Sequence, residues 1–141
     1  MTTSTSCLRI PDQLTYKLTI RGDIRDKDGG VRSYTKQMAV TNAAPVVRLS
    51  ATTPTTLKVG SPLGVSGWFS DKGVNDMPWS YAFIWGDATA NTTGSRSVQG
   101  SGNPVTASHA YAAAGTYYAQ LRVTDKDGRS GTKQITVTVT P

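Results

Sequence analysis

The chain has 141 residues, a formal charge of +6 at neutral pH and nine acidic residues, all of them Asp. This length suits one domain, or one domain plus a fragment. The single cysteine, Cys7, excludes an internal disulfide, and the basic residues are too evenly spread for a nucleic-acid site. No apolar run is long enough to cross a membrane. Abundant Thr and Gly, without any Glu or helical periodicity, predict an all-β protein.

Two short motifs occur twice and organise the chain. Residues Asp26-Lys27-Asp28-Gly29 recur as Asp125-Lys126-Asp127-Gly128, and Thr35-Lys36-Gln37 recurs as Thr132-Lys133-Gln134. The spacing between the two motifs is two residues longer in the first copy, which indicates an insertion there. The copies lie 125 − 26 = 99 and 132 − 35 = 97 residues apart, and an alternating strand follows each, so the repeat is about one immunoglobulin-sized unit long.

Residues 1–44 are predicted to be a partial unit that carries its last three strands. In chain order these strands hold Leu8 and Ile10, then Leu18, Ile20 and Ile24, then Met38 and Val40. Counted by the repeat, Met38 and Val40 match Ile135 and Val137. Three strands with one apolar face are about the minimum for stability, and the link that follows is too short to fold back over that face. We therefore expect another protein chain to cover this segment, with Leu18 and Ile20 as contact residues.

Residues 45–141 are predicted to be a complete unit. Its expected strands are, in chain order, Val46 to Leu49; Leu63, Val65 and Phe69; Trp79, Tyr81, Phe83 and Trp85; Ser95 to Gln99; Val105, Ala107 and His109; Tyr117, Ala119, Leu121 and Val123; and Ile135, Val137 and Val139. Asp127-Gly128 predicts a hairpin turn, and Tyr117 predicts a tyrosine corner. The fold class predicted from this alternation is an all-β, immunoglobulin-like β-sandwich preceded by a partial copy of the same unit.

Four motifs in the second unit carry a family resemblance. They are Trp85-Gly86-Asp87, His109-Ala110-Tyr111, Ala114-Gly115-Thr116-Tyr117 and Val123-Thr124-Asp125-Lys126-Asp127-Gly128. In this order and spacing they resemble the bacterial polycystic-kidney-disease (PKD) repeat. Two positions depart from it, since Ile84 stands where the family usually has Asp and Ala88 where it usually has Gly. The resemblance implies an extracytoplasmic protein (secreted, cell-surface or periplasmic) in which the unit makes protein or glycan contacts or acts as a spacer, without catalytic residues.

The residues themselves offer no catalytic constellation, so we predict that the chain is not an enzyme. His109 is the only histidine, and alternation places it in the inward phase of its strand, which favours a structural role. Arg21-Gly22-Asp23 spells an adhesive tripeptide. The repeat places Gly22 in mid-strand, which favours chance occurrence over an adhesive loop.

The candidates for a metal site are four aspartates, Asp71, Asp76, Asp125 and Asp127. They lie in loops that meet at one end of an immunoglobulin-like sandwich, where carboxylates from two loops can share a Ca²⁺ ion. Lys72, Lys126 and Arg129 lie among them and reduce the negative charge, and Asp also suits turns on its own account. We therefore expect no cofactor, with calcium as the alternative.

The outward face of the third and sixth strands of the second unit is the candidate contact surface. Alternation points Ile84 away from the core, and Tyr118 and Arg122 lie outward on the neighbouring strand. Ile, Tyr and Arg together are typical of contact patches. The alternative is a scatter of exposed apolar side chains, which is normal on protein surfaces.

Two functions are consistent with these features. The first is a non-catalytic extracytoplasmic binding or spacer module that contacts protein or glycan. The second is an extrinsic structural subunit docked in a larger assembly, of which a membrane-associated assembly is one case, with another chain covering residues 1–44. Size-exclusion chromatography distinguishes them, since the module should be monomeric and the subunit should associate.

Overall fold

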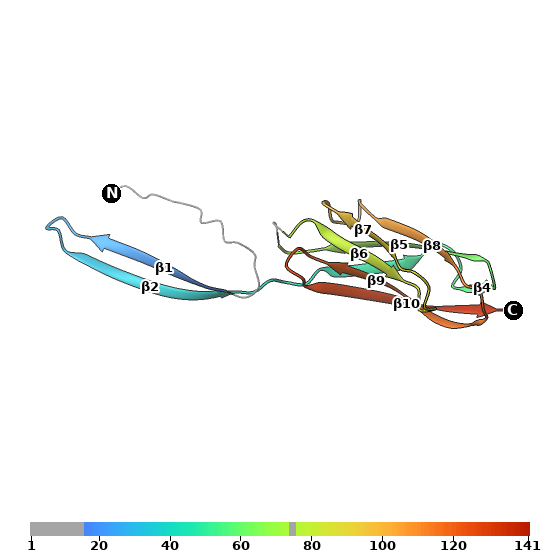
Figure 1. The fold of residues 1–141 in the computed structure, drawn as a ribbon. Helices are drawn as coiled ribbons and strands as arrows, with labels where there is room; N and C mark the ends of the chain where they lie inside the picture. Colours follow the sequence, from blue (N-terminus) through green and yellow to red (C-terminus); the bar gives the residue numbers. More distant parts are fainter. Residues whose placement is uncertain (1–15, 74–75) are drawn as a thin grey trace. The chain divides into compact units, whose positions relative to one another are not determined.

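The computed structural model describes residues 16–73 and 76–141, and within these ranges the chain forms ten β-strands and no helix (Figure 1). Accordingly, no helix among the described residues is long and apolar enough to cross a membrane. The prediction of an all-β chain is confirmed for this part of the sequence. The chain divides into two compact units, Met1–Asn42 and Ala43–Pro141.

Two sheets pack face to face in the unit Ala43–Pro141 (Figure 1). The larger sheet contains, in spatial order, β4 (Thr56–Lys58), β10 (Ser130–Thr140), β9 (Gly115–Thr124), β6 (Trp79–Ile84) and β7 (Thr92–Arg96). The smaller sheet contains β3 (Val46–Ala51), β5 (Pro62–Ser70) and β8 (Val105–Ala110). Because β5 and β8 lie in one sheet and β6 and β7 in the other, the chain crosses between sheets, as in immunoglobulin-like sandwiches.

Alternation decides which side chains enter the space between the two sheets. The smaller sheet buries Leu63, Val65 and Phe69 of β5, and the larger sheet opposes them with a row that includes Phe83, Trp85, Leu121, Val123 and Val137. Burial of these two apolar faces is the main favourable contribution to packing of the sheets. The inward faces predicted for these strands are confirmed.

The short strand β4 is missing from the sequence-based prediction. It is three residues long and buries one side chain, Leu57, so it is too short to show alternation. Its pairing is parallel to the end of β10, where Leu57 stands opposite Val139. A strand held by a partner far along the chain leaves no local signal in the sequence.

The edge strand β7 occupies Thr92–Arg96, so its prediction at Ser95 to Gln99 is wrong by three residues at each end. The chain leaves the sheet after Arg96 because the next residues bind the end of β5 instead. The Gln99 side-chain amide donates to the Asp71 carbonyl over 3.1 Å, and the Gly100 N–H donates to the Phe69 carbonyl over 2.9 Å.

Two turns adopt the geometry predicted from their residues. The Tyr117 hydroxyl donates to the Ala113 carbonyl over 3.0 Å, which is the bond that defines a tyrosine corner. In the turn between β9 and β10, Gly128 takes φ 88, a left-handed conformation that glycine adopts without steric cost. Both predictions are confirmed.

The unit Met1–Asn42 contains an antiparallel hairpin of β1 (Tyr16–Arg25) and β2 (Val31–Val40). The pairing runs residue for residue from Tyr16 opposite Val40 to Arg25 opposite Val31, without a bulge. The strand predicted around Leu8 and Ile10 lies outside the described residues.

The hairpin corrects one detail of the repeat. Met38 stands opposite Leu18, and Val137 stands opposite Tyr117 at the same distance from the turn. Counted from the turn, Met38 therefore takes the place of Val137, and its predicted match with Ile135 is wrong. The reason is that both hairpins pair without interruption, so the two extra residues of the first copy form no bulge.

Candidate functional site

The outward face of the larger sheet brings the predicted contact residues together. Strand pairing sets Ala82 of β6 opposite Arg122 of β9, and Ile84 opposite Gln120. Tyr118 lies two residues from Gln120 on the same face of β9, and 55% of it is exposed. Ile84, Tyr118 and Arg122 thus share one surface. The pairing of β6 with β7 on one side and β9 on the other makes the base of this surface rigid.

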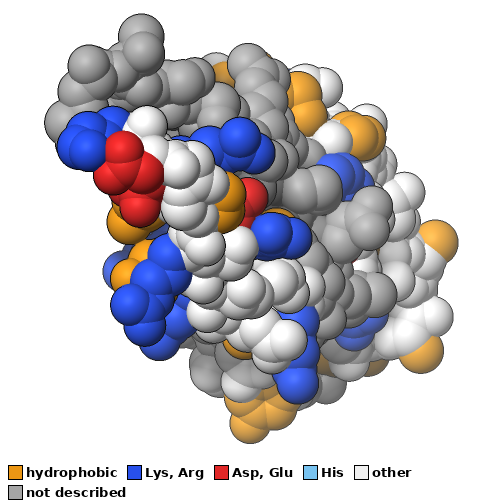
Figure 2. All heavy atoms as spheres, turned by 90° about the vertical axis from the view of Figure 1, so that its left-hand side faces the viewer, with side chains coloured by type: hydrophobic (Ala, Val, Ile, Leu, Met, Phe, Trp, Pro, Cys, Tyr) orange, Lys and Arg blue, Asp and Glu red, His pale blue; other side chains and the backbone are white. Residues whose placement is uncertain are grey.

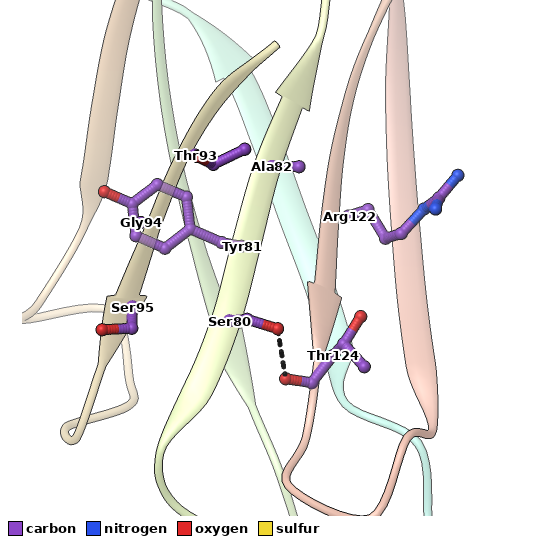
Figure 3. A pocket seen from close by; sticks show the side chains of 8 residues that line it. All are labelled: Ser80, Tyr81, Ala82, Thr93, Gly94, Ser95, Arg122 and Thr124. Carbon is purple, nitrogen blue, oxygen red and sulfur yellow. Dashed lines mark hydrogen bonds between the residues drawn. The ribbon is translucent and has the colours of Figure 1, made fainter.

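A hollow of about 530 Å³ runs along this face between β7 and β9 (Figure 3). Its outward-facing lining consists of Ser80, Ala82, Thr93, Ser95, Arg122 and Thr124. The hollow exists because β6 presents only two small side chains here, Ser80 and Ala82, while β9 beside it carries the larger Arg122 and Thr124. Sequence analysis did not identify it, although the small residues of β6 are a visible signal.

Gly94 is part of the same construction. A Cβ atom at Gly94 would come within 2.4 Å of the Tyr81 hydroxyl oxygen, so the Tyr81 ring can lie against β7 only because this residue has no side chain (Figure 3). An aromatic ring over a glycine on a neighbouring strand is a recognised way of stabilising an edge. Tyr81 therefore helps to hold β7 in place as one wall of the hollow.

The outward face of β6, β7 and β9 carries a single charged side chain. Among the outward residues of β6, β7 and β9, all of which the structure describes, Arg122 is the one charged side chain. The others are Ser, Thr, Gln, Ala, Ile and Tyr. Figure 3 shows the Arg122 side chain pointing away from β6, so its exposed guanidinium can bind a carboxylate in bidentate fashion at the edge of the hollow.

The predicted metal candidates come together only in part. One carboxylate oxygen from each of Asp71, Asp76 and Asp125 lies within 4.8 Å of the others. Asp127 is not in this group, and its carboxylate lies 2.5 Å from Lys126 Nζ. Lys126 Nζ also lies 3.4 Å from Asp76 Oδ1, so an ammonium group already stands beside the cluster. The hydrogen bond to Asp127, followed by that to Asp76, raises the pKa of Lys126 and keeps it charged.

Two of these carboxylates also accept hydrogen bonds that hold the loops in place. Asp125 Oδ1 accepts hydrogen bonds of 2.9 Å from the backbone N–H groups of Asp127 and Arg129, which closes the β9–β10 turn. Asp71 Oδ2 accepts a bond of 3.0 Å from Trp79 Nε1. Carboxylate oxygens that already accept hydrogen bonds from backbone and indole N–H groups, and that lie beside a lysine, are poor ligands for Ca²⁺.

Calcium at millimolar concentration should therefore change the melting temperature of the protein by less than about 2 °C, because a ligand stabilises a fold only in proportion to its binding. The measurement is a thermal melt followed by circular dichroism with and without CaCl₂. Lys126→Ala is the matched variant, since it removes the internal cation and should increase any effect of calcium. A rise of several degrees in the unmodified chain that Asp125→Ala abolishes would show instead that the cluster binds the ion.

His109 lies in an aromatic stack at the other end of the sandwich. Its Nε2 is 2.6 Å from Asp87 Oδ2, and its ring stacks on Trp85 with centroids 4.7 Å apart. The Tyr111 hydroxyl donates to the Trp85 carbonyl over 3.0 Å, and burial, followed by the charge of Asp87, raises the pKa of Tyr111 to about 12. The imidazole is thus held by packing and by one carboxylate, which is the structural role predicted for it.

Asp87 also organises the loop that follows Trp85. Burial acts to raise its pKa, but hydrogen bonds from Thr89 and His109 outweigh this effect and lower the pKa overall. The next residue, Ala88, takes φ 63, a left-handed conformation that costs a residue with a Cβ roughly 1–2 kcal/mol. The departure from the family's usual glycine at this position therefore carries conformational strain.

The β1–β2 hairpin has one apolar and one polar face. Ile20, Ile24, Tyr34 and Met38 are exposed on the first face, where Leu18 is half-buried. On the opposite face, Arg21, Asp23 and Ser33 bind one another, so the Arg-Gly-Asp tripeptide lies in mid-strand as predicted. Figure 2, viewed from the side of the hairpin turn, shows basic and acidic side chains side by side. The predicted contact residues Leu18 and Ile20 lie in the first unit, whereas Ile84, Tyr118 and Arg122 lie in the second.

The two packed sheets and the tyrosine corner of residues 43–141 define an immunoglobulin-like domain. A family model described as PKD domain matches residues 42–140. The chain belongs to this PKD domain family, as the sequence motifs indicated. PKD domains are extracellular, non-catalytic modules that commonly take part in protein or carbohydrate interaction.

The solved structures that are similar to the chain include two PKD domains. The PKD domain of an M14-like peptidase from a Thermoplasmatales archaeon is 22% identical with a TM-score of 0.56, and the match covers 72% of this chain and 100% of that one. The PKD1 domain of Epp from Vibrio anguillarum is 26% identical with a TM-score of 0.47, over 70% of this chain and 95% of that one. The first supports the sandwich fold. No curated protein matches the chain in sequence.

Proposed function

We propose that the chain is a non-catalytic, extracytoplasmic binding and spacer module whose contact surface is the outward face of β6, β7 and β9. The observation that carries this proposal is the hollow beside Arg122, because it combines a shaped surface with one uncompensated positive charge on that face. Exposed Tyr118 adds a flat aromatic ring at the edge of the same surface. Arg and Tyr are the side chains that most often supply binding energy at contact surfaces.

The chemistry of the face suits an extended polar ligand with carboxylate groups. Hydroxyl groups of Thr93 and Ser95 can each donate and accept a hydrogen bond, as sugar hydroxyls and peptide groups require. The Ser80 hydroxyl already donates to the Thr124 carbonyl and that of Thr124 already bonds to Ser130, so these two mainly offer a further acceptor. A protein segment and an acidic glycan both meet these requirements. The membership of the PKD family supports an extracytoplasmic location, meaning secreted, cell-surface or periplasmic, for such a contact.

Ile84→Asp and Tyr118→Ala should each weaken binding at this face about tenfold or more, because a buried contact or a stacked ring at a hot spot typically contributes at least 1.4 kcal/mol. The measurement is binding to an array of acidic and neutral glycans and of secreted proteins, with melting temperature as the check that the fold is intact. Thr138→Ala on β10 of the same sheet is the control and should bind normally. If both Ile84→Asp and Tyr118→Ala bind like the unmodified chain, this face is not the contact surface.

A second candidate function has its own observation. The apolar face of β1–β2 exposes Ile20, Ile24, Tyr34 and Met38, which water disfavours. We infer that another protein chain covers this face, as it would in an extrinsic structural subunit docked in a larger assembly, of which a membrane-associated assembly is one case. In size-exclusion chromatography such a subunit should associate, whereas a simple module should elute as a 15.0 kDa monomer.

A further inference from the structure

We propose that β1–β2 is the closing hairpin of a second immunoglobulin-like sandwich, and that its apolar face is covered by strands equivalent to β3, β5, β6 and β8. These strands would come from polypeptide outside residues 16–141. The inference rests on the second candidate function, in which another chain covers the hairpin. The new element is the fold of the covering polypeptide, which we infer to be half of an immunoglobulin-like sandwich rather than an unrelated structure.

The turn of the hairpin is the first step of the argument. Asp26 Oδ1 accepts backbone N–H bonds from Asp28 at 2.9 Å and Gly30 at 2.8 Å. In the β9–β10 turn, Asp125 Oδ1 accepts the two equivalent bonds at 2.9 Å each. Gly29 takes φ 89 and Gly128 takes φ 88. The two hairpins therefore have the same turn, with the same side chain closing it.

The two faces of the β1–β2 hairpin also correspond to those of the β9–β10 hairpin. Counted from the turn, Ile20, Ile24, Met38 and Val40 take the places of Ala119, Val123, Val137 and Val139. Those four residues of the second unit are all buried in its core, between 0% and 4% exposed. The hairpin thus presents apolar side chains at the positions that β9 and β10 bury, and the same alternation puts Arg21, Asp23 and Ser33 on its outer face.

Three positions of the hairpin show how such a sandwich would differ, and at one of them Lys36 takes the place of Ile135, which packs against the core of the second unit. Gly22 takes the place of the buried Leu121, and the residue paired with it is Tyr34, whose ring can fill the volume that the glycine leaves open. Arg32 takes the place of Gly131, which lies directly against Pro45. The first strand of the covering set must therefore lie farther from the hairpin at this point than β3 does.

The second unit shows what covers a hairpin of this kind. β6 pairs with the free edge of β9, and the inward faces of β9 and β10 bury their side chains in one core with those of β3, β5 and β8. The strands β3, β5, β6 and β8 contain 6, 9, 6 and 6 residues. Within the described residues, the one such set of strands already belongs to the second unit, so the proposed cover lies outside residues 16–141.

A second copy of this chain fits the hairpin less well. Arg32 and Lys36 lie on the apolar face, opposite Ile24 and Ile20, so two hairpins packed face to face would bring like charges into one interface. Residues 16–42 contain six Lys or Arg and three Asp, which adds to the repulsion. The second unit of another copy cannot supply the cover either, because its β3, β5, β6 and β8 already pair with or pack on its own β9 and β10. A separate half-sandwich brings no second set of these charges, and its facing residues must accommodate Arg32 and Lys36.

The test extends the protein so that the hairpin can be completed. A copy of residues 43–114 is joined directly before Tyr16 of the chain, in place of residues 1–15, because Tyr16 stands where Gly115 does, and Arg32→Gly makes room for the copied Pro45. We expect amide hydrogen exchange from Leu18 to Ile24 to slow by about 100-fold or more relative to the 141-residue chain. Ile20→Asp should abolish the protection, whereas Thr19→Asp on the other face should leave it.

A second variant covers the case in which the extended chain does not fold. Residues 115–141 of the full chain are replaced by a copy of residues 16–42 that carries Arg32→Gly, which has the same length and the same turn and leaves room for Pro45. The second unit should still melt cooperatively, with Trp85 fluorescence that indicates burial. If neither variant folds around the hairpin, or if the extended chain folds while Leu18 to Ile24 still exchange fast, the half-sandwich proposal is wrong.

The same measurement separates this proposal from the function on which it rests. Strong protection of Leu18 to Ile24 in the monomeric 141-residue chain would mean that the hairpin needs no cover, which overturns both. Protection that increases with protein concentration, together with a dimer by light scattering, would identify a second copy as the cover. That result would keep the contact function and overturn the half-sandwich.

Discussion

Trp85→Ala should lower the free energy of unfolding by about 3–5 kcal/mol, as expected for removal of a large side chain from a packed core. Trp85 is 2% exposed and stacks between Phe83, at a centroid distance of 5.8 Å, and His109, at 4.7 Å. Its removal would leave a cavity that rigid strands cannot close, and it would unseat the imidazole that binds Asp87. The chain has no disulfide to compensate.

Urea titration followed by circular dichroism measures this loss. Trp68→Ala is the matched control, because Trp68 lies on β5 with its side chain in the outward phase and is only half-buried. The control should lose roughly 1 kcal/mol, in proportion to the smaller apolar area that it buries. A loss of less than 1 kcal/mol at Trp85 would mean that the inward face of the larger sheet has been assigned incorrectly.

Gly131→Ala should cost about 3 kcal/mol, although it adds a single methyl group, because overpacking against backbone cannot be relieved by a rotamer change. A Cβ atom at Gly131 would lie 1.8 Å from the carbonyl oxygen and 2.9 Å from the carbonyl carbon of Pro45. The start of β3 and the start of β10 would have to separate. The substitution would therefore loosen the contact between the two sheets where the unit begins.

Gly102→Ala is the control for Gly131→Ala, since nothing lies within 4 Å of a Cβ atom there and the backbone does not take a positive φ. It should be neutral or slightly stabilising, because alanine restricts the unfolded chain more than glycine does. Thermal and urea unfolding of the two variants give the comparison. Equal stabilities would show that β3 and β10 do not approach closely at Pro45.

The sequence was sufficient for the features that depend on local rules. Alternation placed Trp79, Phe83 and Trp85 on one buried face, and the structure buries all three. The corner at Tyr117 and the turn at Gly128 followed from residue types whose backbone or hydroxyl geometry is specific. Each of these signals lies within a few residues of the feature that it predicts.

The candidate sites show where local rules stop. The hollow needs Ser80 and Ala82 of β6 next to Thr93 and Ser95 of β7, and the limits of β7 were predicted wrongly. Those limits depend on Gln99 binding the end of β5, across 28 residues of sequence. No periodicity in the segment itself contains that information.

Residue order and composition were enough to predict an all-β, disulfide-free sandwich with a repeated Asp-Lys-Asp-Gly turn, because alternation and turn chemistry act between neighbouring residues. The folded chain was needed to show that Asp71, Asp76 and Asp125 meet while Asp127 binds Lys126, and that β4 pairs with β10. It also decided that β1 and β2 present their apolar residues on one face of an unbroken hairpin. These outcomes depend on contacts between residues far apart in the chain, whose free energies arise only when the strands come together.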